Sequence, residues 1–448
     1  MKRLISCVLA LLYVMAGFAS GTWILHGKEY RVDTLYHAYI GPGTTQTSIK
    51  LAGPVNLRVF YTTTDLKNEN VDVRAIKHKD TLTGLGTVSN AAESHSTSNR
   101  SYFAGINADF FSSSMPCGIT VVDGEVYCSD QASGWSLFGI DANKIPYSGG
   151  GDFYVKLTAP DYSTAELSAM NLERGTNGLV LYSSRKGANT GTDGNGSEVV
   201  LIPDGEGNFL TPGATVRMRV QGNPNHAGSM PILDNGYILS GSGTKESFVS
   251  NLSEGDVVEV RCAIRFNGFT GGKIQQALGG CPMLVSGGKV LDTENALDHL
   301  TSAQPRTAVG YNAEKNKLVM LVADGRSSIS VGPISKVLAD IMIYAGCSEA
   351  MNFDGGGSST FYVKGEGVIN QPSDGSERSV TDGLYLSTDV PQNDVTITTI
   401  RFMDYAKTLN QGDAYTPVIY GYNQYVYLPF YTYDLNINSI ETFLYQFE

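Results

Sequence analysis

Histidine and cysteine are scarce in this sequence, and neither is arranged as a metal site requires. The 448 residues include 6 histidines and 6 cysteines. No pair of histidines stands at H-x-x-H or H-E-x-x-H spacing, which argues against a zinc centre. A G-x-S-x-G nucleophile elbow and a Walker phosphate loop are also absent, so neither a serine-hydrolase site nor a P-loop nucleotide site is expected. With so few cysteines, stability must come from an ordinary hydrophobic core.

Positive charge and long apolar runs are also in short supply. Lysine and arginine number 32 against 44 aspartates and glutamates, which gives a formal net charge of −12. An acidic surface repels nucleic acid and anionic lipid, and no basic cluster overrules the net sign. Beyond the first 21 residues, no stretch approaches the ~18 apolar residues of a spanning helix. We therefore expect neither a nucleic-acid partner nor a membrane span.

The first 21 residues have the pattern of a signal peptide. Lys2 and Arg3 precede an apolar run over residues 4–19, and Ala19 and Gly21 offer small residues for cleavage. The mature protein is therefore expected to be exported. Five cysteines would remain, an odd number that requires a free thiol or an intermolecular bond. A disulfide between Cys117 and Cys128, on either side of a turn signal, is left open.

Short strand patterns dominate the rest of the sequence. Apolar runs of four to eight residues alternate with clusters of Gly, Asn, Asp and Ser, as at residues 103–109, 257–264 and 318–323. One clear helix begins near Pro333 and ends at Gly346, with a single apolar stripe between them. A weaker helix is expected within residues 81–94. The predicted class is α+β, with a β-dominated sheet core and few helices.

The composition divides the chain near residue 388. Residues 22–99 are expected to form a β-rich N-terminal segment of the main domain. Pro391 marks a linker, and residues 388–448 are Tyr-rich and alternating. This tail is expected to form a small β-module; its alternating part, residues 395–448, is short for a sandwich, so whether the module is complete is left open.

A run of three glycines is the most informative segment. Asn352 and Asp354 precede it on one face of a short expected strand, and hydroxyl residues follow it. Without Cβ atoms the backbone can approach a ligand closely and direct N–H groups at an anionic oxygen such as phosphate. A plain tight turn is the alternative, but the adjacent carboxylate and amide favour a functional site. The segment after Asp354 consists of Gly355, Gly356, Gly357, Ser358 and Ser359.

A second Asn-x-Asp occurs earlier in the chain, at Asn107 and Asp109. Alternation places both on one face of a strand whose other face is apolar. Aspartate is disfavoured in a strand unless it is paired or functional. A turn-forming aspartate at the end of the strand is the competing interpretation.

Three arginines stand beside expected strand ends. Arg306 opens a strand, Asp324 and Arg326 close the next one, and Arg378 follows a turn. In so acidic a protein, such arginines are candidates for bidentate contacts to phosphate. Each alone is more often a surface ion pair of little energetic weight.

Together these motifs resemble the phosphodiester glycosidase family. The matching stretches lie in the family's order across about residues 100–387, which is the expected catalytic domain. They comprise residues 104–111, 118–124, 279–284 with 287–289, 306–311, 322–326, the helix from Pro333, 352–360 and 371–381. The resemblance is to bacterial relatives of the mannose-6-phosphate uncovering enzyme, an N-acetylglucosamine-1-phosphodiester α-N-acetylglucosaminidase. It implies location in the periplasm or at the surface of a bacterium, without the cysteine-rich module and membrane anchor of the mammalian enzyme.

The reaction implied is hydrolysis of the sugar–phosphate bond of a sugar-1-phosphodiester or phosphoglycan. A departing phosphate monoester is a weak base, so stabilising its charge matters more than protonating it. Asp354 is assigned as the catalytic carboxylate, acting as nucleophile or base, and Asp109 as its partner or a ligand of a sugar hydroxyl. The other assignments are Asn107 and Asn352 for positioning, Asp324 for orienting an arginine, and Arg306 and Arg378 with residues 355–359 for the phosphate.

Two other functions fit the same residues. A non-catalytic glycan-binding surface protein could use the same pocket, and a metal-assisted phosphodiesterase would cleave the P–O bond instead. No cofactor is required by the proposed chemistry. The loops at Asp152 and at residues 193–196 leave room for a structural calcium ion, although plain turns are the favoured interpretation.

Overall fold

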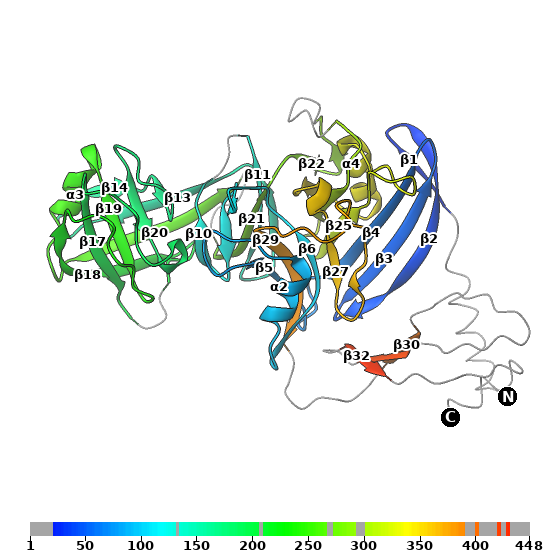
Figure 1. Cartoon of the computed structure of the whole chain (residues 1–448), viewed down its shortest axis with the longest axis horizontal. Helices are drawn as coiled ribbons and strands as arrows, with labels where there is room; N and C mark the ends of the chain where they lie inside the picture. Colours follow the sequence, from blue (N-terminus) through cyan, green and yellow to red (C-terminus); the bar gives the residue numbers. More distant parts are fainter. Residues whose placement is uncertain are drawn as a thin grey trace, which may run out of the picture.

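The computed structural model describes residues 21–130, 134–205, 209–266, 272–292 and 301–389, together with the backbone of three later strands. The described chain is rich in strands, as the sequence predicts. An eight-stranded module lies at one end of an elongated molecule, and the strands β1–β4 lie at the other (Figure 1). The predicted signal peptide falls outside the described residues, except for Gly21. Within the described ranges, none of the helices has the length and apolar character needed to cross a bilayer.

A nine-stranded sheet forms one half of the main body. Its N-terminal strands pair with strands from the second half of the chain, since β4 lies beside β25. In order across the sheet, the strands are β1 (Gly21–Leu25), β2 (Lys28–Gly41), β3 (Thr44–Ala52), β4 (Asn56–Asp65), β25 (Lys317–Ala323), β24 (Arg306–Tyr311), β26 (Glu349–Asn352), β22 (Met283–Ser286) and β23 (Lys289–Val290).

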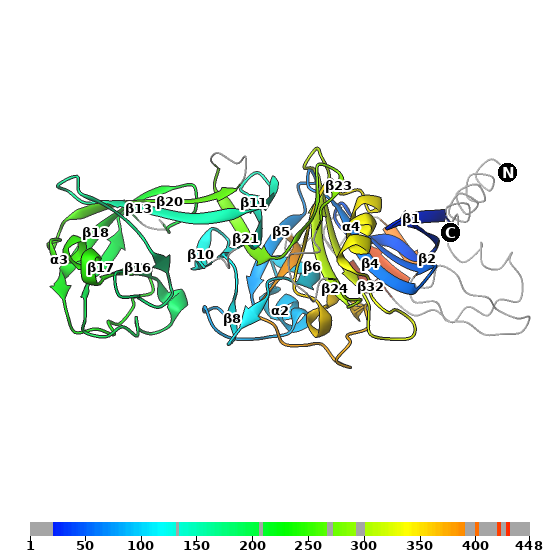
Figure 2. The same ribbon diagram turned by 90° about the horizontal axis from the view of Figure 1, so that it is seen from above.

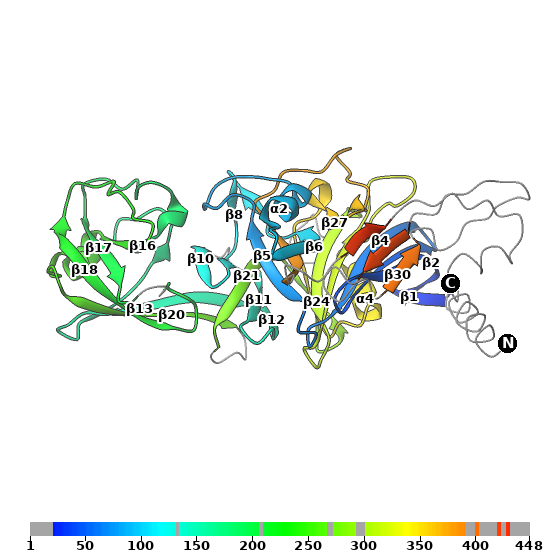
Figure 3. The same ribbon diagram turned by 90° about the horizontal axis from the view of Figure 1, so that it is seen from below.

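A five-stranded sheet packs against this larger sheet. Its strands are β28 (Gly367–Val368), β27 (Phe361–Val363), β6 (Arg100–Asn107), β29 (Asp382–Asp389) and β5 (Asp72–Lys77). One apolar cluster lies between the two sheets, with Ile106 and Leu384 on one side and Met320 and Met351 on the other. The helix α2 (Val88–His95) lies beside β6 in Figure 3 and shares a smaller cluster with it.

The opposite face of the nine-stranded sheet is covered by α4 (Ser335–Tyr344). Val337, Leu338, Ile341 and Met342 on this helix are buried in a cluster with apolar residues of β4 and β25. The predicted helix is therefore confirmed, starting two residues after Pro333. Gly346 follows its end with a φ of 99°, a conformation that favours glycine. Burial on both faces makes this sheet a rigid support for the loops at its edge.

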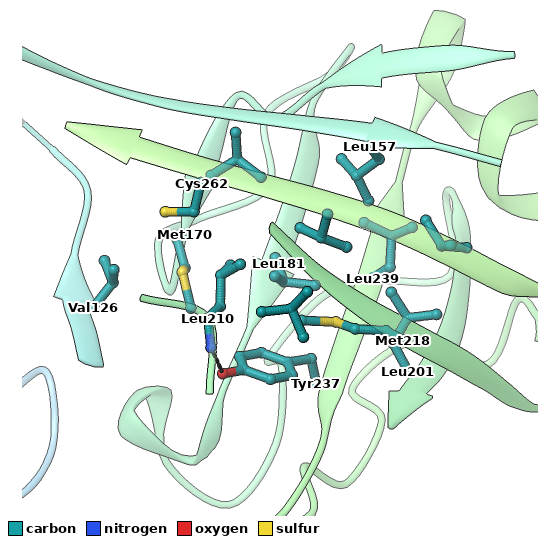
Figure 4. Packing of buried hydrophobic residues seen from close by; sticks show 14 of the residues in the cluster. Val126, Leu157, Met170, Leu181, Leu201, Leu210, Met218, Tyr237, Leu239 and Cys262 are labelled. Carbon is teal, nitrogen blue, oxygen red and sulfur yellow. Dashed lines mark hydrogen bonds between the residues drawn. The ribbon is translucent and has the colours of Figure 1, made fainter. Parts of the chain in front are cut away.

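The third sheet and the module form a second continuous core. The third sheet contains β10 (Glu125–Cys128), β9 (Thr120–Val122), β21 (Ile274–Gly280), β11 (Ser136–Asp141) and β12 (Pro146–Gly149), and a two-stranded ribbon joins β7 (Phe111–Ser112) to β8 (Met115–Pro116). Between β12 and β21 the chain builds the eight-stranded module, which it enters through β13 and leaves through β20 (Figure 2). Val126 of the third sheet lies in one cluster with Leu181, Leu239 and Cys262 of the module (Figure 4).

The module consists almost entirely of antiparallel strands. Across the sheet these are β14 (Thr164–Glu166), β13 (Gly151–Thr158), β20 (Val257–Phe266), β18 (Thr215–Asn225), β17 (Ser197–Pro203), β19 (Tyr237–Gly241), β16 (Leu179–Tyr182) and β15 (Ala169–Met170), with the helix α3 (Glu246–Ser250). The strand patterns were visible in the sequence, but their separation into a module was not. Thr388 and Asp389 end β29 of the main body, and beyond them the described backbone forms a three-stranded sheet of β30 (Thr399–Phe402), β31 (Ile419–Tyr422) and β32 (Tyr427–Phe430).

Candidate active site

The ends of β6 and β26 meet along one edge of the main body. Antiparallel pairing sets Asn352, at the end of β26, opposite Ala308 in β24. In the five-stranded sheet it sets Asn107, at the end of β6, opposite Gly383 in β29. Asp109 and Asp354 each follow one of these strand ends by two residues. The two Asn-x-Asp motifs, 245 residues apart, therefore come together as parts of one site.

The two asparagines hold the backbone of this edge in place. Asn107 donates from Nδ2 to the carbonyl oxygen of Asp354 at 2.7 Å, and its Oδ1 accepts from Thr307 Oγ1 at 2.8 Å and from the N–H of Thr360 at 3.1 Å. Asn352 donates to the carbonyl oxygens of Cys281 and Phe353 at 2.7 and 2.6 Å. Both side chains are almost fully buried. These contacts fix the backbone that carries Asp354 and Thr360 and the turn at Cys281.

Asp109 lies at the bottom of the site with an exposed fraction of 1%. Its Oδ2 accepts from the N–H of Gly118 at 2.7 Å, whereas its Oδ1 is buried without a hydrogen-bond partner among the described residues. A Cβ atom on Gly279 would lie 2.6 Å from Oδ2, so only glycine allows the carboxyl group this position. Burial, followed by the neighbouring Asp382, raises the pKa of Asp109 well above its usual range. Asp109 is therefore protonated over a wider pH range than an exposed aspartate.

Asp382 and Lys77 are site residues that the sequence did not reveal. Asp382 Oδ1 accepts from the N–H of Asp109 at 2.9 Å, and its Oδ2 accepts from Thr381 Oγ1 at 3.0 Å. Lys77 is 1% exposed and donates from Nζ to the carbonyl oxygen of Thr381 at 3.1 Å. Burial lowers the pKa of Lys77, and Asp382 and Asp109 oppose that shift. The available signal was Lys77 directly after the apolar residues Ala75 and Ile76 at the end of β5, because a lysine buried there requires compensating charge.

Asp354 is the more accessible carboxylate and has a different environment. Burial raises its pKa to about 6, while a hydrogen bond from Ser358 and the charge of Arg378 oppose the shift. Asp354 is therefore ionised at neutral pH. The more deeply buried Asp109 holds its proton more strongly, because its pKa is raised further. Two carboxyl groups whose environments separate their pKa values are a common basis for assigning acid and base roles.

The glycine run brings two guanidinium groups to the loop that follows Asp354. A Cβ atom on Gly356 would lie 3.0 Å from Nη2 of Arg326, and one on Gly357 would clash with Arg378. Gly356 also has a φ of 63°, which disfavours other residues. The sequence predicts that the N–H groups of this loop bind phosphate. The N–H of Gly356 cannot do so as it stands, because it already donates to the carbonyl oxygen of Pro305 at 2.9 Å. The glycines admit side-chain cations rather than acting mainly through their own backbone.

The arginines predicted for phosphate binding have different surroundings. Arg378 is exposed and donates from Nη2 to Asp374 at 2.6 Å and from Nη1 to Ser358 Oγ at 3.3 Å. Arg306 is only 2% exposed and donates to the carbonyl oxygens of Ser302 and Pro333. Burial lowers the pKa of Arg306 to about 10. The exposed Arg326 is better placed than Arg306 to meet a ligand at the glycine run.

Asp324 lies under the same loop rather than at its surface. Its Oδ1 accepts from the N–H of Gln371 at 2.8 Å, and its side chain is 2% exposed. Burial raises the pKa of Asp324, and the charge of Arg58 opposes that shift. The arginine whose charge acts on the Asp324 carboxyl group is therefore Arg58, and not Arg306 or Arg378.

The described residues contain no group of three or more acidic, histidine or cysteine side chains arranged to hold a metal ion. In the loops considered for calcium, Asp152 forms an ion pair with Arg265, and Asp193 accepts from Arg174 at 2.7 Å and from Asn195. The five cysteines of the described chain are all free. Cys117 and Cys128 are therefore not joined, and burial raises the pKa of Cys117 to about 11.

Replacing Asp109 with asparagine should stabilise the protein at neutral and higher pH. A group whose folded-state pKa is raised contributes stability at low pH and loses it as the pH rises toward that pKa. Removing the ionisable group should therefore raise Tm more at pH 8 than at pH 5, by about 2 °C or more at pH 8. Thermal unfolding of both proteins at the two pH values measures this difference. Equal Tm values at pH 8 would contradict the buried, raised-pKa carboxyl group.

Comparison with known proteins identifies the class to which this site belongs. Residues 213–387 match the family model described as Phosphodiester glycosidase, and this segment includes Asp354, Asp382 and all three arginines. These residues belong to the phosphodiester glycosidase family, which confirms the resemblance seen in the sequence. The match begins within the module and ends in β29. Asn107 and Asp109 lie before it, and the fold brings them to the same site.

Relatives with sequence or structural similarity are distant. The chain is 40% identical over 88 residues to an uncharacterized SPbeta prophage-derived protein of Bacillus subtilis, a match that covers 20% of this chain and 13% of that protein. A solved protein of Burkholderia pseudomallei is 17% identical with a TM-score of 0.60, covering 82% of this chain and 99% of its own. One from Synechocystis is 15% identical with a TM-score of 0.59, covering 77% and 62%. The structural matches show a shared fold.

Proposed function

We propose that this protein is an exported enzyme that hydrolyses the bond between the anomeric carbon and the phosphate oxygen of a sugar-1-phosphodiester. An N-acetylglucosamine-1-phosphodiester or a similar phosphoglycan is the proposed substrate. The observation that carries the proposal is the position of Asp354, with a pKa of about 6, directly before a glycine run bordered by Arg326 and Arg378. The family match supports a hydrolase of phosphodiester glycosides.

In the proposed reaction the phosphate side of the substrate lies at the glycine run. The guanidinium groups of Arg326 and Arg378 bind the phosphate oxygens and stabilise the negative charge that develops as the C–O bond breaks. The leaving phosphomonoester keeps the electron pair of that bond. Because it is a weak base, it needs no proton from the enzyme.

The sugar side lies toward the carboxyl groups. Ionised Asp354 acts at the anomeric carbon, either as a base toward water or as a nucleophile whose adduct water then hydrolyses. The oxygen of water ends on the sugar, and its proton passes through Asp354 to solvent. Protonated Asp109 donates a hydrogen bond to a sugar hydroxyl, and Asp382 holds the backbone of Asp109 in place.

Product analysis tests this proposal against its two rivals. With UDP-N-acetylglucosamine in ¹⁸O-water, we expect free N-acetylglucosamine that carries the label and UDP that does not. Cleavage of a P–O bond would instead put the label on phosphorus, either in UDP beside free N-acetylglucosamine or in the pair N-acetylglucosamine 1-phosphate and UMP, and would support the phosphodiesterase. Binding without turnover across a panel of sugar-1-phosphodiesters would support the glycan-binding protein. Asp354→Asn serves as the control for contaminating hydrolases.

A further inference from the structure

A pair of aromatic side chains begins at the residue after Asp109 and has no part in the reaction described above. Phe110 directly follows Asp109, and Trp135 directly precedes β11. Their ring centroids are 5.0 Å apart with an interplanar angle of 65°, a favourable edge-to-face arrangement. Both side chains are only half-buried, so this apolar surface remains partly open.

Trp135 lies on the same side of the third sheet as the Asp109 carboxyl group. In β11, Leu137 is paired with Gly279, the residue whose missing Cβ leaves room for Asp109. Trp135 comes two residues before Leu137 and directly before the first residue of β11. The strand periodicity, continued by this one residue, places both side chains on one face, about 7 Å apart along the chain. The contact between Trp135 and Phe110 agrees with this placement.

An independent observation concerns the second oxygen of the Asp109 carboxyl group. Oδ1 of Asp109 is buried without a hydrogen-bond partner among the described residues. Buried polar atoms are nearly always paired, so an unpaired one in a site calls for a ligand atom. The ligand at this position must therefore present an apolar face to the aromatic rings and a polar group to Asp109.

We propose that Trp135 and Phe110 form the sugar-binding wall of the site, with the indole of Trp135 stacked on the apolar face of a pyranose ring and Phe110, inclined at 65° to it, packed against the indole. A pyranose has C–H groups on its faces and hydroxyl groups around its rim, which is the combination that the rings and Asp109 Oδ1 require. The inference rests on the proposed function and extends it, because it assigns a surface to the sugar. The guanidinium groups at the glycine run serve the phosphate.

The two tryptophans of the chain allow a direct binding test. Trp23 stacks on Tyr344 with centroids 4.7 Å apart, at the far side of the nine-stranded sheet, so it is a matched control. In Trp23→Phe, where Trp135 is the remaining indole, titration with N-acetylglucosamine or glucose should change the tryptophan emission. In Trp135→Phe the change should be lost. A sugar-dependent change that persists in Trp135→Phe, or none in Trp23→Phe, would overturn the proposal.

Kinetics separate stacking from a structural role. Trp135→Ala should raise KM for a sugar-1-phosphodiester and weaken inhibition by the free sugar by roughly 10-fold, with inhibition by inorganic phosphate unchanged. Trp135→Phe should restore most of the loss, because a ring is kept. Equal loss of sugar and phosphate inhibition would indicate general disruption of the site and contradict the assignment.

Failure of this inference can be told from failure of the proposed function. Sugar binding at Trp135 without hydrolysis of any sugar-1-phosphodiester would retain the sugar wall and refute the enzyme. Hydrolysis with normal KM and normal sugar inhibition in Trp135→Ala would retain the enzyme and refute the sugar wall. If the emission changed with uridine but not with the monosaccharides, the nucleoside part of the substrate would lie at these rings. That result would also refute the sugar wall.

Discussion

Asp354→Asn should lower turnover by at least ~10²-fold, the size expected when a nucleophilic or acid–base group is lost. Asparagine keeps the shape of the side chain and can still accept from Ser358 or the backbone, so the loop should keep its structure. What is lost is the negative charge that acts at the anomeric carbon. Inhibition by inorganic phosphate should be largely retained, because the arginines are unchanged.

The pH dependence of the wild-type enzyme is part of the same expectation. Asp354 must be ionised to act, and its pKa is about 6, so kcat/KM should fall about tenfold per pH unit below pH 6 and level off above it. His78 does not account for this limb, because burial lowers its pKa to about 4. In Asp354→Asn the limb near pH 6 should disappear from the residual activity.

Asp161→Asn provides the matched control for this charge removal. Asp161 lies at an exposed turn of the module, where it accepts from Ser163 at 2.6 Å, and it belongs to no part of the site. Its kcat and KM should equal those of the wild type. Near-normal turnover in Asp354→Asn would remove Asp354 from catalysis and make Asp109 the next carboxylate to test.

Arg378→Lys and Arg306→Lys should have opposite consequences. Lysine keeps the charge of Arg378 but not the planar fork that contacts both Asp374 and Ser358, so inhibition by phosphate should weaken by roughly 10-fold or more. Tm should stay the same, since Arg378 is exposed. Arg306→Lys should instead lower Tm by several degrees, because it breaks buried hydrogen bonds to Ser302 and Pro333.

Phosphate inhibition constants and Tm values for both variants, with Arg326→Lys as the third member, measure this contrast. In Arg306→Lys, phosphate inhibition should stay within about twofold of the wild type. If that variant kept its Tm and lost phosphate inhibition, the phosphate would lie at Arg306, as the sequence alone suggested. If Arg326→Lys had no effect, the glycine run would carry only Arg378 as a ligand for phosphate.

Several elements of the fold were predictable because their causes are local. The helix α4 has its apolar stripe, its early proline and its closing glycine within fourteen residues, and it forms where these signals place it. The strand β26 and the glycine run after it likewise follow from alternation and from the absence of Cβ atoms. The module was not predictable. It is separated from the main body by the way its strands pair, and that pairing is not visible in any short stretch of sequence.

The site shows the same division between local and distant causes. The sequence by itself determined that Asn107 and Asp109, and likewise Asn352 and Asp354, share one face of a short strand pattern, with three glycines directly after Asp354, since each motif is contained in a few residues. Only the tertiary structure decided that Asp382, 273 residues from Asp109, accepts its N–H, that Arg306 turns inward while Arg326 meets Gly356, and that Trp135 reaches Phe110. These contacts join strands that are distant in the chain, and their register is set by how whole sheets bury their apolar faces.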